Sequence, residues 1–182
     1  MLQRDLIAAI VLLAFACGMS APAQPQTVAL PDLGQAVTPQ ELAGYFAIPP
    51  NGAGLPPGSG TASQGAEMYA TQCVACHGDK LQGVSAIGGP ALVGGRGTLA
   101  TSKPVRTVES YWPYATTVFD YVKRAMPFNA PKSLTDDEVY GVAAYILQLN
   151  GIIGENDVMN AQTLPKVRMP NRDGFIPFSR QQ

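Results

Sequence analysis

The clearest hydrophobic pattern lies near the C-terminal end of the chain, in SLTDDEVYGVAAYILQLNG (residues 133–151). Its apolar residues recur at spacings of three and four, which places them on one face of a helix. These residues are Val139, Val142, Ala143, Ile146 and Leu147. Thr135 and Glu138 form a capping-box pattern before the run, and Asn150-Gly151 is typical of a helix end. The pattern predicts a well-defined final helix.

Two earlier stretches also predict helices. SQGAEMYATQC (63–73) is expected to be capped by Ser63, with Glu67 favoured at its positive end. YATTVFDYVKRA (114–125) regains helical spacing, and Pro127 stops it. Glycine is frequent in residues 78–103, so irregular loops are expected there. The chain shows no internal repeat, and no stretch has a pattern that predicts a strand.

The flanks of this helical region differ from it in composition. Residues 20–60 contain eight prolines and two charged side chains, Asp32 and Glu41, which predicts an extended arm. Within it, TPQELAGYF (38–46) could form one short helical turn with Thr38 as cap. The compact part is expected to start near Thr61. After Gly154 the tail is punctuated by proline, and we expect it to lie, without helix, across the domain or against a partner.

The N-terminus has the pattern of a secretory signal. Arg4 precedes an apolar run from Leu6 to Ala16, and Ala21-Pro22-Ala23 is a plausible cleavage site. The run is about half the roughly 20 residues that span a bilayer, so an uncleaved anchor is the weaker reading. Lipid attachment at Cys17 is a further alternative. The sequence therefore predicts an exported, periplasmic protein that meets a membrane only if the signal is retained or Cys17 is lipidated.

These features divide the chain into a signal peptide (1–23), a proline-rich arm (24–60), a helical domain (61–151) and a C-terminal tail (152–182). The 12 Lys and Arg residues nearly balance the 13 Asp and Glu residues, and the formal net charge is −1. A balanced chain lacks the basic stripe typical of nucleic-acid binding. We therefore expect no nucleic-acid partner.

The candidate chemistry is concentrated in CVACHGDK (73–80), which holds Cys73, Cys76 and the single histidine of the chain, His77. Cys-x-x-Cys-His in an exported protein is the attachment motif of a c-type haem. Two thiols on one helical turn reach the two vinyl groups of a porphyrin, and the adjacent imidazole then points at the iron. A zinc site would need more His or Cys ligands, and a thioredoxin-like redox pair would need a βαβ pattern. A structural disulfide between Cys73 and Cys76 is the remaining alternative.

The iron would need a second axial ligand or an open position. With one histidine, bis-histidine ligation is excluded, and Cys17 is expected to leave with the signal. Met126 in RAMPFNAP follows a predicted helix and precedes Pro127, so it is the candidate distal ligand, with ordinary core filling as the alternative. Met68 falls on the proximal side. Met159 and Met169 lie in the tail.

Other residues have predicted supporting roles. The Pro90 carbonyl is placed to accept the Nδ1–H of His77, which would fix the imidazole. Arg96 and Trp112, together with Tyr111, could contact the haem propionates, although Trp112 could equally be buried for packing. Gly65 and Tyr69 on the first helix match a close crossing against Tyr145 on the last.

Together these residues resemble a class I c-type cytochrome over about residues 61–151: a helix, CxxCH, glycine-rich loops with GPAL, a helix leading to methionine, and a closing helix. A narrower resemblance rests on GAGLPPGSGTASQGAEMY, YWPYATTVFDYVKRAMPF, LTDDEVYGVAAYILQLNGII and LPKVRMPNRDGF. These stretches are similar to the cytochrome subunits of bacterial molybdenum sulfur and sulfite dehydrogenases, the Sox sulfur dehydrogenase among them. Some members of that family carry a second haem domain, whereas this chain has one CxxCH.

The resemblance implies an all-α, class I cytochrome c fold around one covalent haem c. It implies an electron-transfer subunit without catalytic residues of its own. Electrons would come from a molybdenum-containing dehydrogenase subunit and pass to a soluble cytochrome or an oxidase. Whether the partner oxidises sulfane sulfur or sulfite is left open. The alternatives are a free-standing periplasmic carrier of a respiratory chain, and a haem enzyme or gas sensor with an open sixth position.

Overall fold

The computed structural model describes residues 34–38, 40–41 and 48–176. The chain divides into two units, residues 1–39 and 40–182, and each is described by itself. In the first unit, residues 34–38 are exposed and bend at Gly34. The predicted signal peptide, Cys17, most of the arm and residues 177–182 lie outside the described residues. Of the predicted turn in TPQELAGYF, Gln40 and Glu41 are described and are helical.

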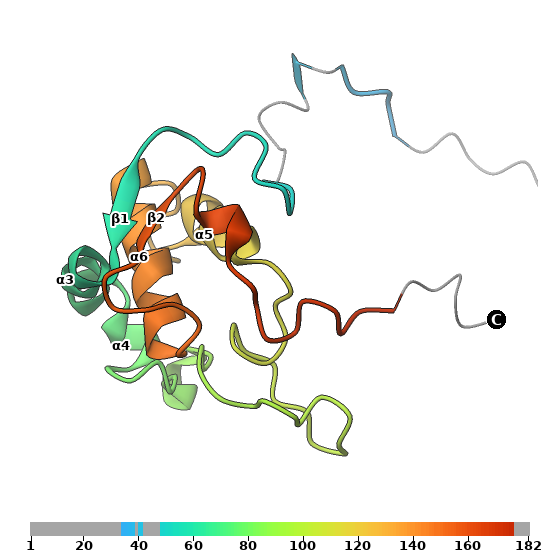
Figure 1. Ribbon diagram of the computed structural model, residues 1–182, viewed down its shortest axis with the longest axis vertical. Coiled ribbons are helices and arrows are strands. Elements are labelled where there is room, and N and C mark those ends of the chain that lie inside the picture. Colours follow the sequence, from blue (N-terminus) through green and yellow to red (C-terminus); the bar gives the residue numbers. More distant parts are fainter. Residues whose placement is uncertain (1–33, 39, 42–47, 177–182) are drawn as a thin grey trace, which may run out of the picture. The chain divides into compact units, whose positions relative to one another are not determined.

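The second unit is built on two crossing helices, α3 (Ala62–Gln72) and α6 (Asp136–Leu149). The capping box of Thr135 and Glu138 is present at the start of α6, as predicted. The five apolar residues predicted for its inner face are all buried. Tyr140, Gly141 and Ala144 are buried as well, so α6 is enclosed on more than one face. Figure 1 shows α6 between α3 and the helix α5 (Ala115–Ala125).

The start of α3 differs from the prediction. Its N-cap is Thr61, whose hydroxyl accepts the Gln64 N–H while the Gln64 side chain accepts the Thr61 N–H. Ser63 is exposed within the first turn and does not cap the helix. The prediction of Ser63 was wrong because a reciprocal box needs a partner three residues after the cap, and Gln64 stands three after Thr61.

Glycine allows α3 and α6 to cross closely. A Cβ placed on Gly65 would overlap the backbone carbonyl of Gly141, so the two backbones touch where neither helix has a side chain. Tyr69 and Tyr145 then stack beside the crossing, with ring centroids 5.1 Å apart and planes tilted by 53°. The predicted packing of Gly65 and Tyr69 against the last helix is therefore present.

The helix α5 (Ala115–Ala125) packs on α6 and ends at Met126. Val118, Phe119 and Val122 are buried, as their spacing predicts. The Phe119 ring meets the Tyr140 ring of α6 at a centroid distance of 4.4 Å. This contact completes the helical core.

A small antiparallel sheet joins the two flanks of the helical region. Strand β1 (Ser59–Thr61) pairs with β2 (Val158–Asn160), with Gly60 opposite Met159. The sequence did not predict these strands, because three residues are too few to show alternation and the partners lie about a hundred residues apart. The pairing places the start of the tail beside α6.

Both flanks lie on the domain. The Ile48 N–H donates to Asp120 Oδ1 at 3.0 Å, and the Tyr140 hydroxyl donates to the Pro56 carbonyl at 2.9 Å. In the tail, Met159, Leu164 of the short helix η2 (Leu164–Lys166) and Met169 are buried. Residues 158–169 thus lie across the domain, which was one of the two predicted placements. The prediction of a tail without helix was wrong, because three residues suffice for the short 3-10 helix η2.

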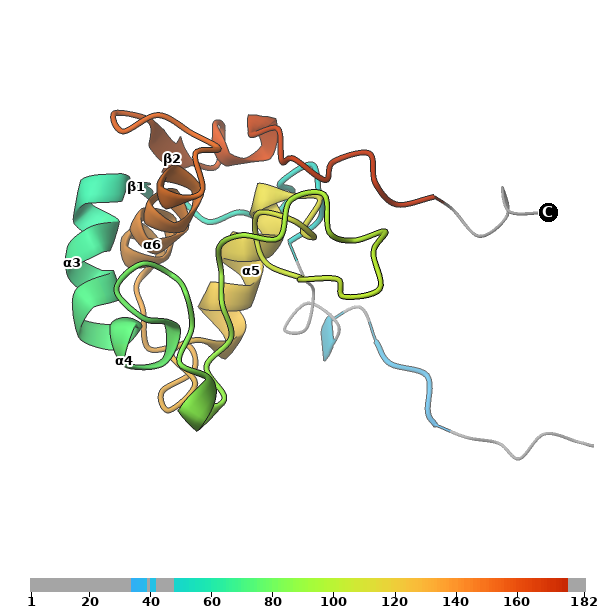
Figure 2. The same cartoon turned by 90° about the horizontal axis from the view of Figure 1, so that it is seen from below.

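The remaining elements are short. Helix α4 (Val74–His77) follows α3 directly, and η1 (Ser85–Ile87) lies in the irregular loops that the glycines predicted. Figure 2 shows α3 and α4 on one side of α6 and α5 on the other. Within the described ranges, no helix is long and apolar enough to cross a membrane.

Candidate haem site

The motif residues share one turn of helix at the junction of α3 and α4. Cys73 separates the two helices, and its carbonyl accepts the N–H groups of Cys76 at 3.1 Å and His77 at 2.9 Å. Cys73 is half-buried and Cys76 is exposed, and both thiols are free. Two thiols and an imidazole are therefore presented together by a single rigid turn.

The orientation of the His77 ring is set by the loop that follows η1 in the chain. Nδ1 of His77 lies 2.8 Å from the Pro90 carbonyl, the contact predicted from the sequence. A carbonyl can only accept, so this contact assigns the proton to Nδ1 and leaves Nε2 as the lone-pair donor. A hydrogen bond of this kind is the usual means of fixing a metal-ligating imidazole.

Three successive backbone carbonyls, those of residues 76–78, accept hydrogen bonds from outside the motif. Cys76 O accepts the Val84 N–H at 3.0 Å, and His77 O accepts the Gly83 N–H at 2.7 Å. Gly78 O accepts the buried hydroxyl of Tyr69 at 2.8 Å. The motif is thus held on two sides, by α3 and by the loop that follows it.

Two of these supports were missed in the sequence. A Cβ on Gly89 would overlap the Cys76 carbonyl. The loop can therefore bring Pro90 to His77 only because residue 89 has no side chain. The Gly-Gly pair before Pro90 was the available signal. The Tyr69 contact had none, because a tyrosine on a helix face is most often read as packing.

The thiol of Cys73 has a raised pKa. Burial raises the pKa of Cys73 to about 11, and the neighbouring Cys76 adds to the rise. Redox-active Cys-x-x-Cys motifs lower the pKa of one thiol so that a thiolate attacks at neutral pH. Burial of Cys73 does the opposite, so Cys73 is not the thiol that such a motif would activate.

Met126 lies at the end of α5, and its N–H donates to Val122 O at 3.1 Å. Its side chain is half-buried and packs on the same core cluster as Cys73, Val74 and Trp112. The tail methionines are used differently: Met159 and Met169 are 3% and 1% exposed, which is core packing. Met126 is therefore only partly buried, and its approach to His77 stays a prediction.

Arg96 and Trp112 are engaged within the protein. Arg96 forms an ion pair with Glu109, and it donates to the Asn150 carbonyl at 2.7 Å. These contacts tie the loop before α5 to the end of α6. Trp112 lies edge to face with Tyr121, at a centroid distance of 5.6 Å. Their predicted contacts with propionates stay predictions.

The donor set fits a covalent haem c. Cys73 and Cys76 can supply two thioether bonds from one turn, and His77 offers Nε2 while Nδ1 is held. Among the described residues, no three His, Cys, Asp or Glu side chains gather as a metal site.

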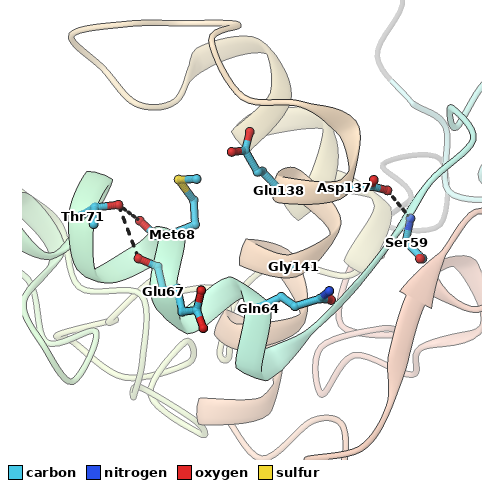
Figure 3. A pocket seen from close by; sticks show the side chains of 8 residues that line it. All are labelled: Ser59, Gln64, Glu67, Met68, Thr71, Asp137, Glu138 and Gly141. Carbon is cyan, nitrogen blue, oxygen red and sulfur yellow. Dashed lines mark hydrogen bonds between the residues drawn. The ribbon is translucent and has the colours of Figure 1, made fainter.

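A separate groove of about 430 Å³ lies between α3 and α6 and is shown in Figure 3. Its lining includes Gln64, Glu67, Met68, Asp137 and Glu138. None of the predicted haem-binding residues lines it. The Asp137 carboxylate accepts a hydrogen bond from the Ser59 N–H at 2.7 Å.

The fold and the motif together define a class I c-type cytochrome, and comparisons with known proteins agree. Residues 60–146 match the family of cytochrome C oxidase, cbb3-type, subunit III. The crystal structure of the sulfane dehydrogenase SoxCD from Paracoccus pantotrophus superposes with a TM-score of 0.71 and 38% identity, over 84% of this chain and 75% of that chain.

A thiosulfate dehydrogenase of Stutzerimonas stutzeri (strain A1501) is 31% identical over 115 residues, 61% of this chain. The chain spans 34% of the length of that relative. The chain belongs to the c-type cytochromes, whose haem c is bound covalently, and it resembles the cytochrome subunit of the Sox sulfur dehydrogenase.

Proposed function

We propose that the protein is a periplasmic monohaem cytochrome that transfers single electrons as a subunit of a molybdenum-containing sulfur or sulfite dehydrogenase. The observation that carries the electron-transfer role is the imidazole of His77, held through Nδ1 by Pro90 beside two thiols on one turn. The likeness to SoxCD supports the dehydrogenase partner, and both relatives bear names of sulfur-oxidising enzymes.

Each residue has a distinct task in this proposal. Cys73 and Cys76 hold the haem covalently, so that it is not lost outside the cytoplasm. His77 and Met126 would bind the iron, with Pro90 holding the imidazole, and Arg96 and Trp112 would contact the propionates. A bound haem would supply a ferric/ferrous couple, and a thioether ligand raises the reduction potential of such a couple.

Two strong axial ligands suit electron transfer rather than catalysis, because they leave no position open for a substrate. Electrons would enter from the molybdenum subunit and leave to a soluble cytochrome or an oxidase. Oxidation of a sulfur compound releases electrons in pairs at molybdenum, so a one-electron carrier must receive them one at a time.

The test is the visible spectrum of the purified holoprotein with and without carbon monoxide, followed by affinity purification from the source organism. We expect a low-spin spectrum, no shift with carbon monoxide, and a molybdenum protein that co-purifies in a 1:1 ratio. A high-spin iron that binds carbon monoxide would favour an enzyme or sensor with an open sixth position. A low-spin cytochrome that purifies alone would favour a free-standing carrier.

A further inference from the structure

The end of the described tail returns to the loop that precedes α5. The Asn171 side-chain amide donates to the Tyr111 carbonyl at 2.7 Å. The Phe175 ring then meets the Tyr111 ring edge to face, at a centroid distance of 5.2 Å. Figures 1 and 2 both show this part of the tail running beside the loops before α5. Two segments about sixty residues apart thus form one continuous surface.

This surface is apolar at its centre. Val105, Phe175 and Ile176 are 44%, 52% and 66% exposed, although each is a large hydrophobic residue. The Tyr111 ring contacts the Phe175 ring, and Ile176 follows Phe175 in the chain. Contiguous exposed apolar side chains on a protein surface are typical of an interaction site, whereas scattered ones are not.

Two arginines lie over aromatic rings at or beside the same surface. The Arg106 guanidinium lies over the Tyr111 ring at 5.9 Å, and that of Arg172 lies over the Tyr114 ring at 4.3 Å. Segments 103–106 and 168–176 together carry four cationic residues and one anionic residue, Asp173, in a chain whose net charge is −1. Asp173 is already paired with Arg168 at 2.8 Å. The local charge is therefore clearly positive.

We propose that Val105, Arg106, Tyr111, Arg172, Phe175 and Ile176, here called the tail patch, bind a protein partner whose surface presents carboxylates around an apolar depression. This inference rests on the proposed function, because the partner meant is the molybdenum subunit. An apolar centre with an arginine rim matches the anatomy of stable protein interfaces.

The positions of Arg106 and Arg172 over aromatic rings favour a protein over an anionic membrane as the partner. A guanidinium stacked on an aromatic ring presents its planar fork in one direction, which suits bidentate binding of a carboxylate. Holding that side chain in place before binding also reduces the entropy lost on association. Attraction to a lipid surface needs positive charge alone and gains little from a fixed orientation.

The experiment measures binding of the holoprotein to the purified molybdenum subunit of the same organism. Two double variants are used in the full chain: Phe175→Ser with Ile176→Ser, and Arg106→Glu with Arg172→Glu. Each should weaken binding by about tenfold or more, as expected for central interface residues. The haem spectrum and the thermal midpoint should match those of the wild type, and added salt should weaken the wild type more than the arginine variant.

The matched controls are Leu149→Ser, which alters another exposed apolar residue, and Lys132→Glu, which reverses another exposed charge. Both should bind within about twofold of the wild type. If the wild type binds and both double variants bind equally well, the tail patch is wrong while the proposed function stands. If the wild type itself does not bind the subunit, both proposals fail.

Two further measurements separate other occupants of the patch. Sedimentation with vesicles of phosphatidylcholine and phosphatidylglycerol tests a membrane, and analytical ultracentrifugation tests a second copy of the chain. The proposal would be overturned if both double variants lost vesicle binding or self-association but still bound the molybdenum subunit.

Discussion

At the scale of single residues, Met126 makes the sharpest distinction between a carrier and an open haem site. Met126→Ala should abolish the weak long-wavelength absorption that marks iron–thioether ligation and should lower the reduction potential, because the thioether favours ferrous iron. The measurements are the ferric spectrum and a potentiometric titration of the holoprotein.

The matched control is Met68→Ala. Met68 is also half-buried and packs on the core, but it lies on α3 beside the groove between α3 and α6. Its variant should keep the absorption band and the potential, and lose only some stability. If Met126→Ala behaved like Met68→Ala, Met126 would be packing and the sixth position would belong to another group or stand open.

The raised pKa of Tyr140 predicts how the free energy of unfolding changes at alkaline pH. Burial raises its pKa to about 12, with the Asp136 carboxylate adding to the rise, while an unfolded tyrosine ionises near pH 10. Below pH 10 both states keep the proton, so Tyr140 adds no pH dependence. Between about pH 10 and 12 the unfolded chain loses its proton first, so stability falls as pH rises.

Tyr140→Phe tests this window. The variant should be less stable at neutral pH, because the Pro56 carbonyl loses its donor. Its stability should decline less steeply than that of the wild type between about pH 10 and 12. Urea unfolding followed by far-ultraviolet circular dichroism gives both values. Parallel profiles in the two proteins would contradict the assignment.

At the scale of elements, the crossing of α3 and α6 depends on the glycine at residue 65. Gly65→Ala would ordinarily favour a helix by about 1 kcal/mol. Here the added methyl group meets the Gly141 carbonyl, which is backbone and cannot turn aside. The variant should therefore lower the free energy of unfolding by about 1–3 kcal/mol, the usual cost of overpacking, in guanidinium unfolding of the holoprotein.

Gly154→Ala is the control for this substitution. Its added methyl group would meet nothing closer than 3.5 Å, and Gly154 does not have a positive φ. We expect it to change stability by less than about 0.5 kcal/mol. Equal losses in the two variants would mean that the crossing does not depend on close approach of the backbones.

The elements also show what local sequence can and cannot predict. The capping box at Thr135 and the apolar spacing of α6 are local signals, and the structure confirms both. The Pro90 contact was predicted from the placement of Pro90 in GGPAL, thirteen positions after His77, and the structure confirms it. Strands β1 and β2 were not, since each is too short to carry a pattern and pairs with a distant partner.

Competition between partners limited the prediction of the site in the same way. The contacts of Arg96 with Glu109 and with the end of α6 could not be predicted, while its contact with a propionate stays a prediction. A flexible cation has many possible partners, and sequence spacing does not rank those that are distant along the chain. The Tyr69 hydroxyl on Gly78 is a similar case, because its acceptor is a backbone carbonyl that no residue type marks.

At the scale of the whole molecule, the tail is a structural part of the domain up to Met169. Met159, Leu164 and Met169 are buried in the core, and β2 is the pairing partner of β1. Loss of one large core side chain costs about 2–5 kcal/mol, and a domain has about 5–15 kcal/mol in all. A chain that ends at Asp157 should therefore lose cooperative unfolding.

A chain that ends at Asp173 is the matched control, because it keeps β2, η2 and Met169 and lacks the exposed residues 174–176 and those that follow them. It should unfold cooperatively at the wild-type midpoint and keep the wild-type haem spectrum. Leu164→Ala in the full chain should fall between the two, with a loss of about 2–5 kcal/mol. Thermal unfolding and limited proteolysis distinguish these outcomes. If the chain ending at Asp157 unfolded like the wild type, the tail would be an appendage, and its burial would contribute nothing to the stability of the domain.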